Sequence, residues 1–574
     1  MHRRVVRHIT RRDSRSRVEP SDLRAQPLAI RTHLGVVCGH ITVVLSDRLP
    51  LLLLRLANHA LELRAGERRR DGVGAQHGPE TIGLFRRQSC VRHRKGFPGK
   101  IREQDGGMID RSIAATIHVP PGFAVEVLLF YLKEEIWYMS TTTVNKETVI
   151  PEEIARAVTL PEAYSDLYGT TLPAMKWLRE NAPVAKISVE GYDPYWFLAE
   201  HSTNLEVLRN QDLFHNAGAN IMLQPKAGDE FLRDAFGGHT RVLENLSYLE
   251  PPEHGLYRNT IAHAFLPNAI RQYEALYRTL AKEAVDRLFD EHPDGEADFI
   301  QAIGRSYPLL TIMDMMNIPR SDFDLMLQLT QETFGGDDPD WRREDVPATP
   351  EAFALMWKDS IKRFYEHFLE VVRDRRANPG DDIATTIALS KMPSGELMPE
   401  LMQVNLTMTL GFAGHDTVNS AITGGIHGLA THPDQLELVR ESPKLVNGLV
   451  EEALRWATPA KHFTRDATAD TVLNGIEIKK GDRLMCSFQA ANRDPKVFRN
   501  PDTFDITRRP NPHLSFSFGP HVCLGQHIAK IEMRVLFEEI TSRVKSLELN
   551  GIPRIKQANF VGGFKTMPIK FTKA

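Results

Sequence analysis

The stretch Phe516-Ser517-Phe518-Gly519-Pro520-His521-Val522-Cys523-Leu524-Gly525 sets a single cysteine in a glycine-containing loop that leads into a predicted helix. The N-terminus of a helix carries partial positive charge, which favours the thiolate form of Cys523. Gly519 and Gly525 permit tight backbone turns and the close approach of a flat cofactor. Backbone N–H groups in such a loop can hydrogen-bond a sulfur. An isolated cysteine is most often buried and inert, so the surrounding pattern is what makes Cys523 a candidate functional residue.

A second candidate segment, Ala413-Gly414-His415-Asp416-Thr417, lies inside a long predicted helix over residues 400–430. A glycine within a helix costs about 1 kcal/mol relative to alanine, so Gly414 requires a local reason. Thr417 can hydrogen-bond its own helix backbone and open a groove there. Asp416 and Thr417 could then relay protons. A capping or surface Asp-Thr pair is the common alternative.

Charged residues supply two further patterns. Glu452 and Arg455 are three residues apart on one predicted helix face; a surface ion pair worth under about 1 kcal/mol is the alternative. His254 and Arg258 share a face of a helix that begins after Pro251-Pro252. Arg465 opens the strand that follows the Glu452 helix. Arginine suits carboxylate ligands because its fork binds both oxygens, although each cation alone is more often a surface residue.

Taken together, these segments resemble the cytochrome P450 family over residues 151–574. The cysteine loop matches the family's haem-binding signature at its defining positions, which are Phe516, Gly519, His521, Cys523 and Gly525. The resemblance implies haem b as cofactor, with Cys523 as the ligand of the iron and a thiolate that favours O–O cleavage. It also implies that Phe516 packs near the thiolate and that His521 reaches a haem propionate.

The same resemblance assigns roles to the other patterns. It implies that Asp416 and Thr417 are the oxygen-activation pair, although Val418 stands where the most similar type has a second threonine. It places Glu452 and Arg455 in a buried network with Arg508 that holds the cysteine loop. The implied propionate-binding cations are His254, Arg258 and Arg465.

Within the family, the sequence is most similar to the bacterial, ferredoxin-dependent terpineol hydroxylase type. Matching segments include 190–194, 491–494 and 559–563. Family position implies an apolar substrate pocket formed by Leu410, Ala413, Phe463 and Val561. The expected substrate is a small terpenoid such as terpineol, or an alicyclic or alkylaromatic compound; a steroid is the alternative.

The expected electron source is NAD(P)H through a ferredoxin reductase and a ferredoxin. The glycine run Gly424–Gly428 lies in a predicted helix rather than after a strand, so it is not a dinucleotide-binding loop. Lys530 and Arg534, one helical spacing apart, are candidates for docking an acidic ferredoxin. Two rival classes stay open: a haem-thiolate enzyme that uses peroxide directly, and a non-catalytic haem- or ligand-binding protein.

Residues 1–138 differ from the rest of the chain. Residues 1–100 contain 19 Arg, 2 Lys and 8 acidic residues, whereas the whole chain has a net charge of -3. We interpret this Arg-rich leader as disordered or as translation from an upstream start, with the haem domain spanning 139–574 from Met139. A transit segment and a basic nucleic-acid-binding arm are the functional alternatives.

Composition limits the remaining classes. The near-neutral charge gives no global reason to expect nucleic acid as a partner. The four cysteines lack disulfide or zinc spacing, and no apolar run reaches the roughly 18 residues of a membrane helix. We therefore expect a cytoplasmic monomer without a membrane anchor.

The predicted fold is mainly α with a smaller β region, as in the cytochrome P450 fold, in a single large haem domain. Apolar periodicity and turn residues predict its elements. They are a strand pair over 185–189 and 195–198, helices over 264–288, 320–333, 352–376, 400–430 and 444–456, a hairpin over 472–488, and a last long helix after Gly525.

Overall fold

We describe a computed structural model of the chain. The described residues are 35–37, 40–46, 112–118, 148–216, 220–235, 237–238, 240, 243–336, 338–341, 346 and 350–574. The chain divides into two compact units, Met1–Met139 and Ser140–Ala574. In the first unit, β1 (Gly35–Val37), β2 (His40–Ser46) and β3 (Ser112–His118) pair in the order β1-β2-β3. The predicted domain start at Met139 lies outside the described residues.

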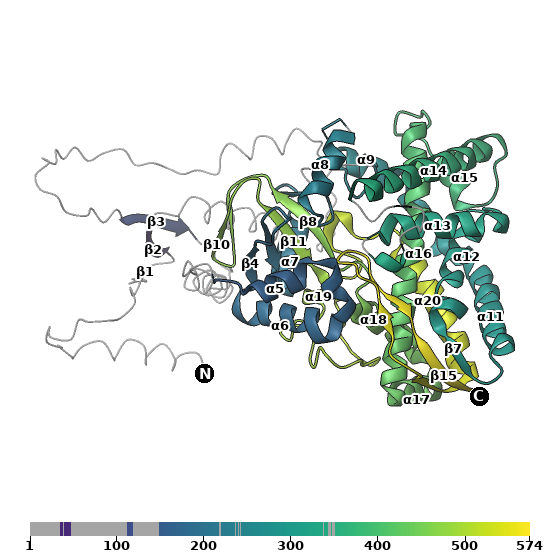
Figure 1. Ribbon diagram of the computed structural model, residues 1–574. Helices are drawn as coiled ribbons and strands as arrows, with labels where there is room; N and C mark the ends of the chain where they lie inside the picture. The colour runs from purple at the N-terminus through teal and green to yellow at the C-terminus, as the bar shows by residue number, and fades with distance from the viewer. Residues whose placement is uncertain are drawn as a thin grey trace, which may run out of the picture. The chain divides into compact units, whose positions relative to one another are not determined.

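The second unit is mainly helical, as the sequence predicts (Figure 1). Its helices are α5 (Glu152–Thr159), α6 (Leu172–Asn181), α7 (His201–Arg209), α8 (Lys226–Ala235), α9 (Glu253–Ile261), α10 (Pro267–Ile270), α11 (Glu274–Glu291), α12 (Ser306–Met315), α13 (Phe323–Phe334), α14 (Pro350–Ala377), α15 (Ile383–Ala388), α16 (Glu400–Thr431), α17 (Pro433–Glu441), α18 (Val446–Ala457), α19 (Phe488–Ala491) and α20 (Gln526–Arg543).

Helix α16 lies at the centre of the helical region, where it packs against α12, α13, α14, α18 and α20 (Figure 1). Its buried residues occur on every face, as expected of a helix enclosed by other helices. It stops at His432, because Pro433 cannot continue its hydrogen bonding. The Asp416–Thr417 segment is therefore held inside the protein by rigid neighbours.

The strands form smaller sheets beside the helices. One sheet has the order β4-β5-β11-β8-β6, a second has the order β12-β15-β7, and two strand pairs are β9-β10 and β13-β14. Their bounds are β4 (Val184–Ile187), β5 (Tyr195–Leu198), β6 (Phe214–His215), β7 (Glu296–Asp298), β8 (His462–Ala467), β9 (Thr471–Leu473), β10 (Ile476–Ile478), β11 (Arg483–Ser487), β12 (Val544–Leu549), β13 (Arg554–Ile555), β14 (Phe564–Thr566) and β15 (Pro568–Lys573).

Three sequence predictions need correction. The helix predicted over 264–288 is interrupted, because Pro267 starts a new helix and α11 begins only at Glu274. The predicted hairpin over 472–488 contains only β9 and β10; β11 instead pairs with β5 and β8. Arg465 lies in the middle of β8 rather than at its start. In each case a long-range partner, or a proline, overrides the local pattern.

Candidate active site

The cysteine loop is shaped by its own backbone hydrogen bonds. The Cys523 N–H donates to the Phe516 carbonyl at 2.9 Å, and the Val522 N–H donates to the Gly519 carbonyl at 3.1 Å. Gly519 has φ +73°, and a Cβ there would lie 2.4 Å from the Leu208 carbonyl oxygen. Glycine is thus required at 519 by both conformation and space.

Gly525 has a different reason to be glycine. Its φ of -81° is available to any residue. A Cβ at this position would meet no protein atom within 4 Å, and the residue lies on a cavity wall beside Cys523. The missing side chain therefore leaves space open to a bound group rather than relieving backbone strain.

The protein alone does not favour the Cys523 thiolate. Burial raises the pKa of the Cys523 thiol, and the Gly525 N–H, Arg258 and the Gln526 N–H only partly oppose this effect. The N–H groups at the helix terminus favour the thiolate, as the sequence predicts, but burial outweighs them. A bound metal cation would supply the missing stabilisation, because a coordinating thiol loses its proton.

A single cavity of about 290 Å³ connects most of the predicted site residues. At the cysteine end its wall includes Phe516, His521, Cys523 and Gly525, with Arg258 and Arg465. Its apolar wall includes Leu410, Ala413 and Phe463, with Thr417.

Val561, Asp416, His254 and Gly519 are not part of this wall, and neither are the network residues Glu452, Arg455 and Arg508. Val561 is buried behind the cavity, where it bridges to the lining residue Ala460. Asp416 is the neighbour of the lining residue Thr417, and His254 lies against the lining residue His521.

Two histidines beside this cavity each have an Nε2 atom without a hydrogen-bond partner. The rings of His254 and His521 are 4.1 Å apart, and the Nε2 atom of each is buried without a hydrogen bond. Burial, then Arg258, lowers the pKa of His254 to about 4. Burial, then His254, lowers the pKa of His521 to about 3. Unsatisfied imidazoles next to Arg258 and Arg465 fit a ligand that brings carboxylates, such as the two propionates of haem.

Helix α16 brings Thr417 to the cavity and keeps Asp416 buried behind it. The Thr417 hydroxyl donates to the Ala413 carbonyl at 2.7 Å, and the helix continues unbroken past it. A Cβ on Gly414 would lie 2.4 Å from Ile312 Cδ1. Close packing against α12 is therefore a reason for this glycine that the sequence did not reveal.

Asp416 has a partner that the sequence analysis missed. Lys556 Nζ lies 3.4 Å from Asp416 Oδ1, and both side chains are almost completely buried. The second oxygen, Oδ2, is buried without a hydrogen-bond partner. The two residues are 140 positions apart in the chain, so no local motif could indicate the pair.

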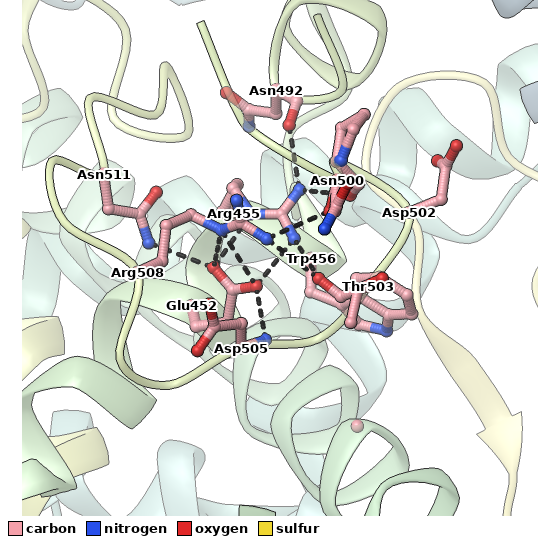
Figure 2. A network of polar contacts seen from close by, with 12 residues as sticks. Glu452, Arg455, Trp456, Asn492, Asn500, Asp502, Thr503, Asp505, Arg508 and Asn511 are labelled. Atoms are coloured by element: carbon pink, nitrogen blue, oxygen red, sulfur yellow. Dashed lines mark hydrogen bonds and ion pairs between the residues drawn. The ribbon is translucent and has the colours of Figure 1, made fainter. Parts of the chain in front are cut away.

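The predicted charged residues Glu452, Arg455 and Arg508 lie in one buried network (Figure 2). Arg455 binds both oxygens of Glu452, at 2.7 and 2.8 Å, and Arg508 Nε lies 3.1 Å from Oε2. Asp505 N–H and the Asn511 amide complete the shell around the carboxylate.

The remaining donors of the network hold the chain that leads to the cysteine loop. Arg455 donates to the Asn492, Pro501 and Thr503 carbonyls (Figure 2). The Asn492 side chain accepts from the Leu514 N–H at 2.7 Å, and the Ser515 hydroxyl donates to the Leu454 carbonyl. Leu514 and Ser515 directly precede Phe516, so the network fixes the start of the loop.

Other cavity residues escaped the sequence analysis. Leu406 and Thr409 line the cavity from α16, and Leu246, Ser247 and Ile312 line it from other segments. The spacing of 406, 409, 410, 413 and 417 along one helix face was a signal that could have found the first group. The second group depends on tertiary packing alone.

A half-buried cysteine loop, one cavity beside it and a set of partners for carboxylates fit a haem-thiolate protein. The chain belongs to the cytochrome P450 family, because the family model described as "Cytochrome P450" matches residues 192–571. The chain is 42% identical over 431 residues to "Cytochrome P450-terp" of Pseudomonas sp, covering 75% of this chain and 100% of that protein. It is 31% identical to "Linalool 8-monooxygenase" of Pseudomonas putida, covering 70% of this chain and 97% of that protein.

A solved structure agrees with this assignment. The crystal structure of CYP108D1 from Novosphingobium aromaticivorans DSM12444 matches with a TM-score of 0.68 and 34% identity, covering 74% of this chain and 100% of that one. The fold prediction is confirmed, the family's cofactor is haem b, and the chain is a cytochrome P450 monooxygenase. No helix in the described part of the chain is long and apolar enough to cross a membrane.

Proposed function

We propose that this monooxygenase hydroxylates a small hydrophobic substrate of the terpenoid type, with electrons from a ferredoxin. The observation that carries the proposal is the continuity of one cavity from Cys523 to an apolar wall formed by Leu410, Ala413 and Phe463. Such a wall favours an apolar substrate, and the lining hydroxyls of Ser247 and Thr409 offer partners for a single alcohol group. The names of the P450-terp and linalool relatives support a terpenoid.

The residues around this cavity have different proposed roles. When bound, haem supplies the redox chemistry that activates O2. Cys523 would hold the iron, and His254, Arg258, Arg465 and His521 would hold the propionates. The apolar wall excludes water from the substrate. Asp416 and Thr417 pass protons to the oxygen side, which requires that the Thr417 hydroxyl release its bond to Ala413.

Ferredoxin is the proposed electron donor, but two candidate docking residues are already paired within the chain. Lys530 Nζ lies 2.8 Å from Glu451. Arg534 contacts Glu274 at 2.9 Å and Glu538 at 2.8 Å. Docking through these cations would have to compete with those ion pairs. If reversing both charges leaves the reduction rate unchanged, the proposed docking position is wrong.

The first test is the reduced carbon-monoxide difference spectrum of the full chain beside Cys523→Ala. A red-shifted thiolate-type band in the parent, lost in the variant, is expected if Cys523 is the iron ligand. Cys486→Ala is the matched control, because Cys486 is a buried cysteine in β11 away from the loop, and it should keep the band. The same spectrum from a chain that starts at Met139 tests whether residues 139–574 suffice.

The second test concerns the substrate and the electron source. Terpene alcohols should shift the haem spin state at lower concentration than their parent hydrocarbons, alkylaromatics or steroids. Turnover with reduced ferredoxin is expected. Turnover with peroxide alone would indicate the peroxide-using class, and ligand binding without any product would indicate a non-catalytic haem protein.

A further inference from the structure

The cation beside Asp416 comes from the C-terminal hairpin rather than from α16 itself. Lys556 follows β13, and its backbone N–H donates to the Gly563 carbonyl at 2.9 Å across the β13–β14 turn. The next N–H, of Gln557, donates to the Asp338 carboxylate, which also pairs with Lys565. Because bonds on both sides fix the hairpin, Lys556 is presented to Asp416 from a rigid element.

The bonding of the pair is incomplete. Lys556 Nζ reaches only Oδ1 of Asp416, at 3.4 Å, and its other neighbour is the ring of Trp341, whose centroid is 4.0 Å away. Asp416 Oδ2 is buried and has no protein donor. A buried carboxylate with one open oxygen can form a further hydrogen bond without first breaking the ion pair.

A polar cavity lies next to Trp341, whose ring contacts the Lys556 ammonium, although neither Asp416 nor Lys556 is part of its wall. It measures about 400 Å³, and its wall includes Arg305, Glu332 and Trp341. Exposed residues such as Gln301 and Arg554 also line it, so it reaches the surface. Such a polar and roomy space can hold water.

Two of its wall residues contact the neighbours of the Asp416 carboxylate. Trp341 carries the Lys556 ammonium on its ring face. The Arg305 carbonyl bonds the ring of His415 at 3.0 Å. His415 itself is committed to Arg305 and to Thr330, at 2.9 Å, so it is not free to shuttle protons. Asp416, the direct neighbour of Thr417, is therefore the acid on this side of α16 that has an oxygen open to a new partner.

We propose that Lys556 is a positioning residue for monooxygenation, one that holds Asp416 between the polar cavity and Thr417 so that protons from cavity water reach the haem side. The proposal rests on the proposed relay role of Asp416 and Thr417. Each turnover consumes two protons for the water that it forms. Asp416 takes each proton from cavity water, which is replenished from bulk solvent, and gives it up through Thr417, so the carboxylate and the ammonium end unchanged.

The chain contains a matched control for the loss of a buried lysine. Lys461 is also almost fully buried, but its Nζ has no hydrogen-bond partner. Burial, then Lys556, lowers the pKa of the Lys461 ammonium to about 7. Lys461→Met and Lys556→Met thus remove the same group from similar surroundings, one without and one with an acid partner.

The experiment compares Lys556→Met, Lys556→Arg and Lys461→Met in the haem-loaded full chain. Lys556→Met should keep the carbon-monoxide band, lower product per O2 consumed on the order of 10²-fold, and enlarge the solvent deuterium isotope effect. Lys556→Arg should recover most of the loss, because it restores a cation. Lys461→Met should match the parent in both quantities. Parent-like product yield and isotope effect in Lys556→Met would overturn the proposal.

A second readout does not depend on turnover. Thermal unfolding of the haem-free chain is measured for Lys556→Met, Asp416→Asn and the double variant. Each single change should lower the midpoint, and the double variant should lower it by less than the sum, because the pair is coupled. Strictly additive shifts would overturn the positioning role. If the parent itself forms no product while the coupling is present, the proposed function fails and the Lys556–Asp416 pair stands.

Discussion

Glu452 and Asp416 are both buried carboxylates beside a buried cation, but their bonding differs. Both oxygens of Glu452 receive hydrogen bonds, from Arg455, Arg508, the Asp505 N–H and Asn511 (Figure 2). Asp416 Oδ1 has one long hydrogen bond, from Lys556 at 3.4 Å, and lies 3.9 Å from His415 Nδ1, whereas Oδ2 has no hydrogen-bond partner. A buried charge with every oxygen bonded is fixed in place, whereas a partly bonded one can accept a new partner.

This difference indicates two separate roles: Glu452 stabilises the protein structure, and Asp416 transfers protons. The Glu452 network ties together the segments that precede the cysteine loop, so it stabilises a position. Asp416 directly precedes Thr417, which lines the haem cavity, and Lys556 contacts Trp341 of the polar cavity, so an open oxygen on Asp416 would be useful for the proposed proton transfer. The comparison predicts that changing Glu452 mainly damages the fold, and that changing Asp416 mainly damages catalysis.

The largest expected effect is that of Glu452→Gln on stability. The change removes the only carboxylate that faces Arg455 and Arg508 in this network and leaves two buried cations without their counter-charge. We expect the free energy of unfolding to fall by about 3–5 kcal/mol. Urea unfolding of the haem-free chain and the haem content after purification measure the loss.

The neighbouring residue supplies the control. Glu451 pairs with Lys530 and His513, and its side chain is 35% exposed. Glu451→Gln should therefore cost less than about 1 kcal/mol. Equal losses from the two substitutions would show that the buried network has no special part in stability.

Asp416→Asn should have the opposite effect to Glu452→Gln, with a small loss of stability and a large loss of catalysis. The amide can still accept the single Lys556 contact, so the stability loss should be smaller than for Glu452→Gln. An amide cannot carry the relayed proton, and product formation should fall on the order of 10²-fold with the carbon-monoxide band retained.

Asp382→Asn tests whether any buried carboxylate would behave in the same way. Asp382 is buried and caps α15 by accepting from the Thr385 N–H. Asparagine can still cap the helix but loses the ion pair of Asp382 with Arg375, 3.1 Å away, so stability should fall by about 1–3 kcal/mol and product per O2 should stay unchanged. A fall in product yield equal to that of Asp416→Asn would remove the distinction between the two carboxylates.

The sequence could predict the cysteine loop and the Glu452 network better than the surroundings of Asp416. The cysteine loop, the α16 motif and the Glu452–Arg455 pair are contiguous patterns, so residue spacing and a family resemblance are enough to locate them. The helix over 400–430 was predicted to within one residue of the observed end at Thr431, because Pro433 marks it.

The missing parts all depend on contacts between distant segments. Lys556 reaches Asp416 across 140 residues, and Gly414 is explained only by Ile312 of α12. Val561 was expected on the pocket wall, but it is not among the lining residues. It forms a β-bridge with Ala460, which does line the cavity. Local periodicity fixes which face of an element is buried but not what it meets there.

The two glycines of the cysteine loop should show a similar difference between a structural role and a role in cofactor binding. Gly519→Ala should destabilise the chain by about 1–3 kcal/mol, because the residue has φ +73° and its new Cβ would meet the Leu208 carbonyl. Gly525→Ala should leave the haem-free chain as stable as the parent and weaken haem binding, because it fills open space beside Cys523. Urea unfolding and a haem titration separate the two effects, and an identical result for both glycines would contradict the assignment.

The last expected effect is the pH dependence from His462, a fully bonded buried group like Glu452. Its Nε2 accepts from the Leu223 N–H at 3.0 Å, so Nδ1 carries the hydrogen toward the Asn559 carbonyl. Burial lowers the pKa of His462 to about 3. The unfolded chain therefore takes up the proton first. Stability is complete above about pH 6.5 and falls by about 1.4 kcal/mol per pH unit below it, down to the folded pKa.

Haem should separate this contribution from that of the unsatisfied histidines. The folded pKa values of His254 and His521 are also low, but propionates would raise them, so their share of the acid sensitivity should shrink when haem is bound. The share of His462 should persist, because its two bonds involve no ligand. Unfolding measured from pH 7 to 5 for the parent and His462→Gln, with and without haem, tests this. If haem leaves the slope of the parent unchanged, His254 and His521 do not meet the propionates.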